Sequence, residues 1–369
     1  HDLKTNNLPG HLSSPIPLDP ITWFSQKTSQ LKGADRLFVV SHTGTVGSID
    51  GRPIIGSAQG LPRLCSLHEL VRFVHGSLLL VAEATRNWVR GNWHEILVLD
   101  QLVEGYLQHL IGAERGSRLH LFTSSSALIR PLWSVVAEKQ GAEILCYHYS
   151  TGGIPLDPGS IEDQDDFGWS LCWWPRQLVW DSRHAEHLSS LALRPGQYDI
   201  VGHIPFEALP ADLTRPGERY VVVFDVTPLD EDTLACRLQD QYYAFSTVSN
   251  FIEQVASTAK SCKLACIWKP KNRSRRETPV EYHRLQAAFE SEKGQDVLRP
   301  DTSPESVISG AFAAISMPLT STAVIAQQMG VPSVYFDVNG IVSQGHPDLR
   351  GIPILSEAKD LRLWLESLN

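Results

Sequence analysis

The run Tyr220–Phe224, which reads Tyr-Val-Val-Val-Phe, constrains the fold of this chain more than any other segment. Five consecutive β-branched or aromatic residues are typical of a strand that is buried on both faces of a parallel sheet. Neighbouring parallel strands need crossover connections, which are usually helices. The run therefore predicts an α/β domain in which strands and helices alternate.

The rest of the sequence shows this alternation on both sides of the run. After it, we expect strands at 263–268, near Val297, at 314–316 and at 333–336, with helices at 241–261, 277–291, 304–310 and 320–330. Before it, we expect strands at 37–40, 78–81, 120–122, 143–147, 177–181 and 198–202, with helices at 21–33, 66–76, 93–112 and 184–193 and another ending near 140. Such an order is typical of doubly wound parallel sheets.

The length of 369 residues suggests two domains, at roughly 100–200 residues each. Pro205, Pro210 and Pro216 interrupt regular structure and indicate a linker. The expected organisation is an extended arm at 1–20, a Rossmann-like domain at 21–204, a linker at 205–217, a second Rossmann-like domain at 218–355 and an amphipathic helix at 356–369. Ligands of doubly wound domains bind at the carboxyl ends of the strands, so we expect a cleft between the facing ends of the two sheets.

Charge and cysteine content exclude several classes of protein. The formal net charge of −9 argues against a nucleic-acid partner. The six cysteines show no C-x-x-C spacing and no cluster that completes a metal site, so we expect reduced, buried thiols and no bound metal. No apolar stretch reaches the roughly 18 residues that a transmembrane helix needs. The sequence begins at His1 rather than Met, as expected of a chain trimmed at its N-terminus.

The most specific motif is the turn Pro318–Thr322, where a strand ends and a helix begins. Free amides and the helix dipole at such a start favour an anion by roughly 0.3–1 kcal/mol. Thr320, Ser321 and Thr322 add three hydroxyls, and one would suffice to cap the helix. We therefore interpret Pro318, Thr320, Ser321 and Thr322 as a phosphate site, with simple N-capping as the alternative.

Two further groups of polar residues follow predicted strands of the same domain. Lys269 and Lys271 leave the sheet after the strand at 263–268, and two ammonium groups at this spacing suit a nucleotide phosphate. Their alternative is a solvated basic loop, as for the nearby arginines. Asp225 and Thr227 follow Phe224, and Asp225 either binds a ligand hydroxyl or caps a turn.

These motifs resemble those of bacterial surface-polysaccharide biosynthesis proteins named for a Pro-Phe-Thr-Ser motif. The resemblance rests on Phe224–Pro228, Trp268–Lys271 and Pro318–Ala323 followed by Gly330–Ser333, and it departs at Leu319, where the name-giving Phe would stand. The layout is also distantly similar to that of sialyltransferases and Kdo transferases. In those enzymes a histidine stands at the position that Lys271 occupies in this chain.

The resemblance implies a glycosyltransferase of the GT-B class, with two Rossmann-like domains and a donor nucleotide in the second. The donor would be a CMP-sugar, or a UDP- or GDP-sugar, and it serves as a substrate, so no cofactor is expected. The acceptor would be a glycan or lipid-linked glycan of a bacterial surface polysaccharide. An Asp-x-Asp motif is absent from the predicted strand ends, so we expect an inverting, metal-independent transfer. The resemblance implies a cytoplasmic location and allows for peripheral association with the inner face of the cytoplasmic membrane.

An inverting transfer needs a base within hydrogen-bond reach of the acceptor hydroxyl. The candidates at strand ends of the first domain are His42 and Asp50, in a glycine-containing loop, and Glu83, which ends the strand expected at 78–81. His94 and His148 are weaker candidates.

Two other functions fit the same architecture. A nucleotide-sugar epimerase or hydrolase would use acid–base residues in both domains, for which His203 and His346 are available. A non-catalytic protein would bind a nucleotide or glycan within an assembly complex. Release of free nucleotide from the donor alone would favour the first, and binding without turnover would favour the second.

Overall fold

The computed structural model describes most of the chain after residue 63. The described residues are 38–39, 47–49, 52–54, 64–115, 119–123, 129–148, 150–151, 156, 169–194, 196–203, 219–237, 241–271, 278–300 and 302–368. The chain divides into two compact units, one made of residues 1–149 and 165–206 and the other of residues 150–164 and 207–369. The second unit thus includes residues 150–164, and Leu156 packs against its core.

The first unit contains a parallel sheet in the order β1-β4-β5-β6-β7. Its strands are β1 (Phe38–Val39), β4 (Leu119–Thr123), β5 (Glu143–Tyr147), β6 (Arg176–Val179) and β7 (Gln197–Ile200), and β2 (Gly47–Ile49) and β3 (Arg52–Ile54) form a separate antiparallel pair. Its helices are α2 (Leu67–Val89), α3 (His94–Leu97), α4 (Leu99–Arg115), α5 (Leu132–Lys139) and α6 (Ser182–Leu191), with a 3₁₀ turn η4 (Trp169–Leu171). The core gathers large side chains of this sheet, of α4 and α5 and of the segment before β6, among them Phe122, Trp133 and Trp174.

One expected strand of the first unit is wrong. The segment at 78–81, with Glu83, lies inside α2, which begins at Leu67 and ends at Val89. Four consecutive apolar residues fit a buried strand or a helix equally well, so periodicity alone misassigns them. The start of α2 carried a clearer signal, because Ser66 and Glu69 interact much as in a capping box. The Ser66 hydroxyl accepts a hydrogen bond from the Glu69 amide at 3.1 Å, and the Glu69 carboxylate accepts one from the Cys65 amide at 2.8 Å.

The second unit contains a six-stranded parallel sheet in the order β10-β9-β8-β11-β12-β13. Its strands are β8 (Tyr220–Phe224), β9 (Ala265–Lys269), β10 (Gln295–Val297), β11 (Ala313–Ser316), β12 (Ser333–Phe336) and β13 (Ile354–Leu355). Counted within the unit, this is the order 3-2-1-4-5-6 of dinucleotide-binding domains. All five residues of β8 are buried, as expected of the central strand.

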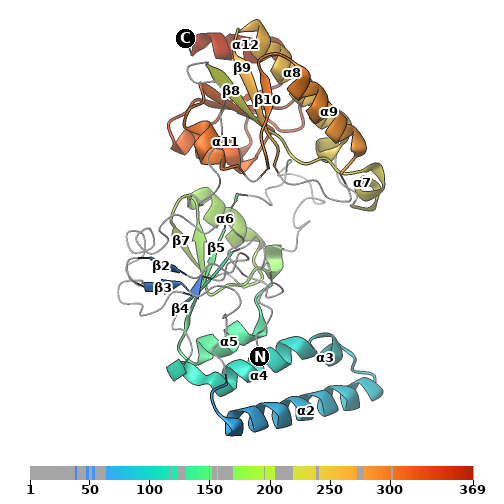
Figure 1. The fold of residues 1–369 in the computed structure, drawn as a ribbon, viewed down its shortest axis with the longest axis vertical. Coiled ribbons are helices and arrows are strands. Elements are labelled where there is room, and N and C mark those ends of the chain that lie inside the picture. The colour runs from blue at the N-terminus through green and yellow to red at the C-terminus, as the bar shows by residue number, and fades with distance from the viewer. Residues whose placement is uncertain are drawn as a thin grey trace. The chain divides into compact units, whose positions relative to one another are not determined.

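Helices connect these strands and cover the sheet (Figure 1). They are α7 (Glu231–Arg237), α8 (Phe245–Ser261), α9 (Val280–Ser291), α10 (Pro304–Ile308), α11 (Ser321–Gln328) and α12 (Ala358–Ser367), with 3₁₀ turns η5 (Gln241–Tyr243) and η6 (Pro347–Leu349). The terminal helix α12 buries Leu361 and Leu365 in the core of this unit. No helix in the described part of the chain is long and apolar enough to cross a lipid bilayer.

Candidate functional site

The strand order of the second unit brings two of the predicted motifs together. The direction of winding reverses between β8 and β11, and ligands of such sheets bind outside the carboxyl ends of the strands at this point. Phe224 and Ser316, the last residues of these strands, are paired in register, and the Met317 amide donates to the Phe224 carbonyl at 3.0 Å. The segments Asp225–Thr227 and Pro318–Thr322 therefore leave the sheet side by side.

Asp225 anchors the loop that follows β9. Its side chain is 2% exposed and accepts hydrogen bonds from the Lys271 amide, at 3.1 Å, and from the Tyr282 hydroxyl. Burial raises the pKa of Asp225 to about 6, and the hydrogen bonds from Tyr282 and Lys271 oppose this rise. Asp225 thus fixes the backbone from which the Lys271 side chain extends.

The two predicted lysines lie in different environments. Lys269 is 6% exposed, and its ammonium group donates to the Pro300 carbonyl at 3.1 Å, so at least one of its donors serves the fold. Lys271 is exposed at the carboxyl edge of the sheet. Of the two, Lys271 is the better placed to reach a bound anion. The arginines at 273, 275 and 276 lie outside the described residues.

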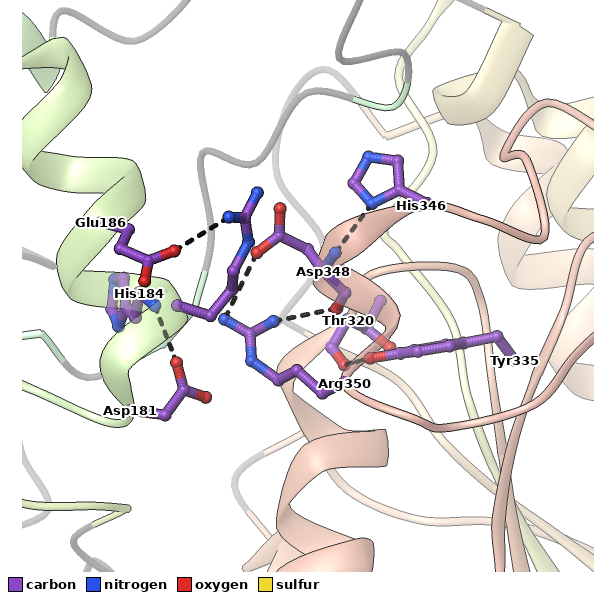
Figure 2. Close-up of polar contacts among 9 residues, drawn as sticks. Asp181, His184, Glu186, Thr320, Tyr335, His346, Asp348 and Arg350 are labelled. Atoms are coloured by element: carbon purple, nitrogen blue, oxygen red, sulfur yellow. Dashed lines mark hydrogen bonds and ion pairs between the residues drawn. The ribbon is translucent and has the colours of Figure 1, made fainter.

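Buried tyrosines hold the turn between β11 and α11. The Tyr242 hydroxyl donates to the Pro318 carbonyl at 2.6 Å. The Tyr335 hydroxyl donates to the Thr320 carbonyl at 3.3 Å (Figure 2). Burial raises the pKa of Tyr242 well above its usual value, so it remains a donor. Between these contacts Leu319 has a φ of +56°, a left-handed conformation that costs a leucine roughly 1–2 kcal/mol. Such strain persists only where the surroundings enforce it.

The hydroxyls of this turn do not cap α11 in the simple way. The Thr320 hydroxyl donates to the Met317 carbonyl at 2.8 Å, and the Thr322 hydroxyl lies 3.1 Å from that of Ser316. Thr320 is the N-cap residue of α11, but its side chain makes no capping hydrogen bond to the first amides of the helix. Uncapped amides at a helix start are donors for an anion. On the neighbouring segment, the Thr227 hydroxyl is buried without a hydrogen-bond partner among the described residues.

A polar loop after β12, of which the sequence singled out only His346, completes this edge of the unit. His346 and Asp348 are 4% and 3% exposed, and the His346 Nδ1 accepts the Asp348 amide at 3.1 Å (Figure 2). Arg350 donates to the Asp348 carbonyl at 3.0 Å, and its own carbonyl accepts from Gln327 of α11 at 3.1 Å. One ring nitrogen of His346 is therefore engaged in capping η6, which weakens its case as an acid–base residue.

The catalytic candidates of the first unit fare differently. His42 and Asp50 lie outside the described residues. Glu83 is exposed on α2 and pairs with Arg86 one turn later, so its prediction from a strand end is wrong. His94 begins the short helix α3 and is also exposed.

The carboxyl edge of the first sheet carries other polar residues. His148, Asp181 and His203 closely follow β5, β6 and β7. The Asp181 carboxylate caps α6 by accepting the His184 amide at 2.7 Å (Figure 2). His148 is fully buried, with Nε2 2.8 Å from the Gln177 amide oxygen, and burial lowers its pKa to about 4. His148 thus stays neutral near pH 7. Within the described residues no group of three or more His, Cys, Asp or Glu could hold a metal ion.

Similarity to known proteins places the chain in a family. Residues 78–365 match the family described as polysaccharide biosynthesis PFTS motif protein. The chain belongs to this family. In this PFTS-motif protein, the sequence Pro318-Leu319-Thr320-Ser321 resembles the motif of the family's name, with leucine where the phenylalanine would stand. No curated protein matches the sequence.

Several solved structures resemble the PFTS-motif protein at low sequence identity. Arabidopsis thaliana UGT89C1 complexed with UDP is 11% identical with a TM-score of 0.51, over 98% of this chain and 90% of that one. The pneumococcal O-GlcNAc transferase GtfA in complex with UDP and GlcNAc is 10% identical with a TM-score of 0.39, over 73% of this chain and 51% of that one. The UDP-GlcNAc 2-epimerase of Methanocaldococcus jannaschii in complex with UDP-GlcNAc and UDP is 10% identical with a TM-score of 0.42, over 73% and 74%.

The chain therefore spans about half the length of GtfA and most of UGT89C1. The likeness to UGT89C1, together with a parallel sheet in each unit, confirms the expected fold class: α/β with two Rossmann-like domains of the GT-B type.

Proposed function

We propose that this PFTS-motif protein is a glycosyltransferase that moves a sugar from a nucleotide-sugar donor to a bacterial surface-polysaccharide acceptor. The observation that carries the proposal is the convergence of Asp225–Thr227, Lys271 and the uncapped start of α11 at the edge where β8 and β11 end. Membership of a polysaccharide biosynthesis family supports the class of reaction. UDP in UGT89C1, a protein of similar fold, supports a nucleotide-linked donor.

The chemistry of the second unit suits the leaving group of such a transfer. A nucleoside phosphate leaves with negative charge, which amides at a helix start and a nearby ammonium group can stabilise. The amides of α11 and the Lys271 side chain would supply these donors, with the hydroxyls of Thr227 and Ser321 as additional contacts. Lys269 would contribute its charge from beneath the loop. This set neutralises the phosphate through protein groups alone, in line with a metal-independent transfer.

The first unit would hold the acceptor, a glycan or lipid-linked glycan, and supply the base. His42 and Asp50 remain the proposed bases for an inverting transfer, and each needs to accept the proton of the acceptor hydroxyl as that oxygen attacks the anomeric carbon. An epimerase or hydrolase would instead consume the donor without an acceptor.

The first test is nucleotide binding by isothermal calorimetry with UDP, CMP, GDP and dTDP. Lys271→Ala removes the side chain but keeps the amide that Asp225 accepts. A charge-assisted hydrogen bond contributes about 1.5–3 kcal/mol, so we expect the best-binding nucleotide to bind about tenfold to a hundredfold more weakly to this variant.

Lys293→Ala is the matched control, because Lys293 is exposed just before β10, at the opposite edge of the same sheet. It should bind as the wild type does. Equal affinities for all three proteins would contradict the phosphate site. If the protein turns over a sugar nucleotide in the absence of an acceptor, its function is that of an epimerase or hydrolase rather than a transferase.

A further inference from the structure

Helix α2 of the first unit exposes an unusual amount of apolar surface. Among the residues whose burial the structure describes, thirteen of the twenty large apolar side chains that are exposed lie between Leu67 and Val98. Nine of them are on α2 itself: Leu67, Leu70, Val71, Val74, Leu78, Leu79, Val81, Trp88 and Val89. Leu67, Leu78 and Val89 are 77%, 63% and 78% exposed. All of these side chains on α2 except that of Leu79 lie on one side of the helix, and a contiguous exposed apolar face of this kind marks an interaction site.

The other side of α2 already has its partner within the unit. Helix α4 lies alongside it (Figure 1). The Tyr106 ring of α4 stacks on Phe73 at 6.4 Å, and its hydroxyl donates to the Arg72 carbonyl at 3.1 Å. A side chain at Gly76 would collide with the Tyr106 ring, which shows how closely the helices approach. The face toward α4 is therefore used, and the exposed apolar face is a separate surface.

Helical spacing places basic residues along one border of that face. His68, Arg72, His75, Arg86 and Arg90 recur at intervals that keep them on one side of a helix with 3.6 residues per turn. All five are exposed. The only exposed acid on α2 is Glu83, and it pairs with Arg86. We call the apolar face and its basic border the α2 surface.

The charges of the α2 surface favour one kind of partner. A second copy of the chain, packed antiparallel about a two-fold axis, would place the basic borders next to each other, and α2 itself, described over its whole length, carries no acidic border to neutralise them. An anionic lipid surface supplies negative charge beside an apolar layer, which matches the order of groups around the helix. Trp88 and Trp93, 57% and 60% exposed, are of the residue type that is enriched at membrane interfaces.

We propose that the α2 surface docks this protein on an anionic membrane. The 23-residue helix would lie in the plane of the interface, with its apolar residues roughly 5–10 Å into the headgroup and acyl boundary and its arginines on lipid phosphates. This surface is distinct from the donor site in the second unit. Docking would bring the first unit to a membrane-borne acceptor, but the binding itself does not depend on the proposed transfer.

Vesicle flotation tests the proposal directly. Wild-type protein is mixed with vesicles of phosphatidylcholine alone or with phosphatidylglycerol, and we expect at least tenfold more protein to float with the anionic vesicles. Val74→Glu combined with Leu78→Glu should abolish this binding. Leu363→Glu is the control, because Leu363 on α12 is 62% exposed, as Leu78 is 63% exposed, and it lies in the second unit. Circular dichroism confirms that each variant is folded.

A second pair of variants separates charge from apolar contact. Arg72→Glu with Arg90→Glu should remove the preference for anionic vesicles, while Lys260→Glu with Lys359→Glu, in the second unit, should not. Wild-type protein that floats with neither vesicle overturns the proposal. A second result would also overturn it. If light scattering shows a dimer for the wild type and a monomer for the Val74→Glu and Leu78→Glu variant, while both float equally well, the surface binds a second copy of the chain. Nucleotide affinity should be the same in all these variants, so failure here leaves the donor site untouched.

Discussion

At the scale of single residues, Asp225 joins structure to the proposed donor site. Its buried carboxylate holds the Lys271 amide and the Tyr282 hydroxyl, and burial raises its pKa to about 6 from an ordinary value of 3.8. Between these two values the folded protein retains a proton that the unfolded chain has lost. The contribution of Asp225 to the free energy of unfolding therefore falls as pH rises from about 4 to 6.

We expect Asp225→Asn to remove this dependence of stability on pH. An amide can accept from the Lys271 amide with its oxygen and donate to the Tyr282 oxygen, so the geometry is retained while the titration is lost. A raised pKa of this size corresponds to about 3 kcal/mol, taking roughly 1.4 kcal/mol per pH unit. Urea unfolding at a series of pH values should show that the variant lacks a decline of up to this amount across pH 4–6. If the free energy of unfolding changes with pH in the same way for both proteins, Asp225 is not the group that titrates.

At the scale of elements, the turn before α11 depends on contacts from other parts of the fold. Leu319 keeps its left-handed φ while Tyr242 and Tyr335 donate to the carbonyls on either side of it. Tyr242 belongs to η5 and Tyr335 to β12, so two other elements set the geometry of the turn between β11 and α11. Removing one of these hydroxyls therefore tests whether the turn belongs to the nucleotide site, independently of Lys271.

Tyr242→Phe leaves the buried Pro318 carbonyl without its hydroxyl donor. We expect a loss of about 1–3 kcal/mol of stability and at least a severalfold loss of nucleotide affinity, because the helix start is no longer held in place. Tyr220→Phe is the matched control. Its hydroxyl donates to the buried Val307 carbonyl at 2.8 Å at the opposite end of β8. It should lose similar stability in thermal unfolding and keep full affinity. If both variants bind equally well, the turn is not part of the site.

The elements also show what sequence could and could not predict. The strands β8, β9, β11 and β12 follow from short apolar runs ended by polar or glycine-rich turns, and the motifs at their carboxyl ends were found for the same reason. The run at 78–81 has no such ends, since helix-forming residues continue on both sides of it, and it belongs to α2. Of the loop from His346 to Arg350 only His346 was singled out, because the order of this loop comes from tertiary contacts, such as that of Gln327, rather than from a local pattern.

At the scale of the whole molecule, each unit contains a buried titratable group with the opposite response to acid. In the first unit, burial lowers the pKa of His148 to about 4, below its ordinary 6.5. The unfolded chain binds a proton between these values and the folded chain does not. The contribution of His148 to the free energy of unfolding is therefore complete above pH 6.5 and is lost as pH falls toward 4. The contribution of Asp225, in the second unit, to the free energy of unfolding rises as pH falls over nearly the same range.

We therefore expect acid to separate the unfolding of the two units. Calorimetric scans from pH 6.5 down to pH 4.5 should resolve a transition of the first unit that moves to lower temperature relative to that of the second, because multidomain proteins unfold in more than one step. His148→Gln, which keeps an amide near the position that bonds Gln177, should reduce the shift of the first transition alone. Asp225→Asn should affect the second transition alone. A single transition that responds equally to both variants would mean that the units unfold together and that their opposing titrations cancel.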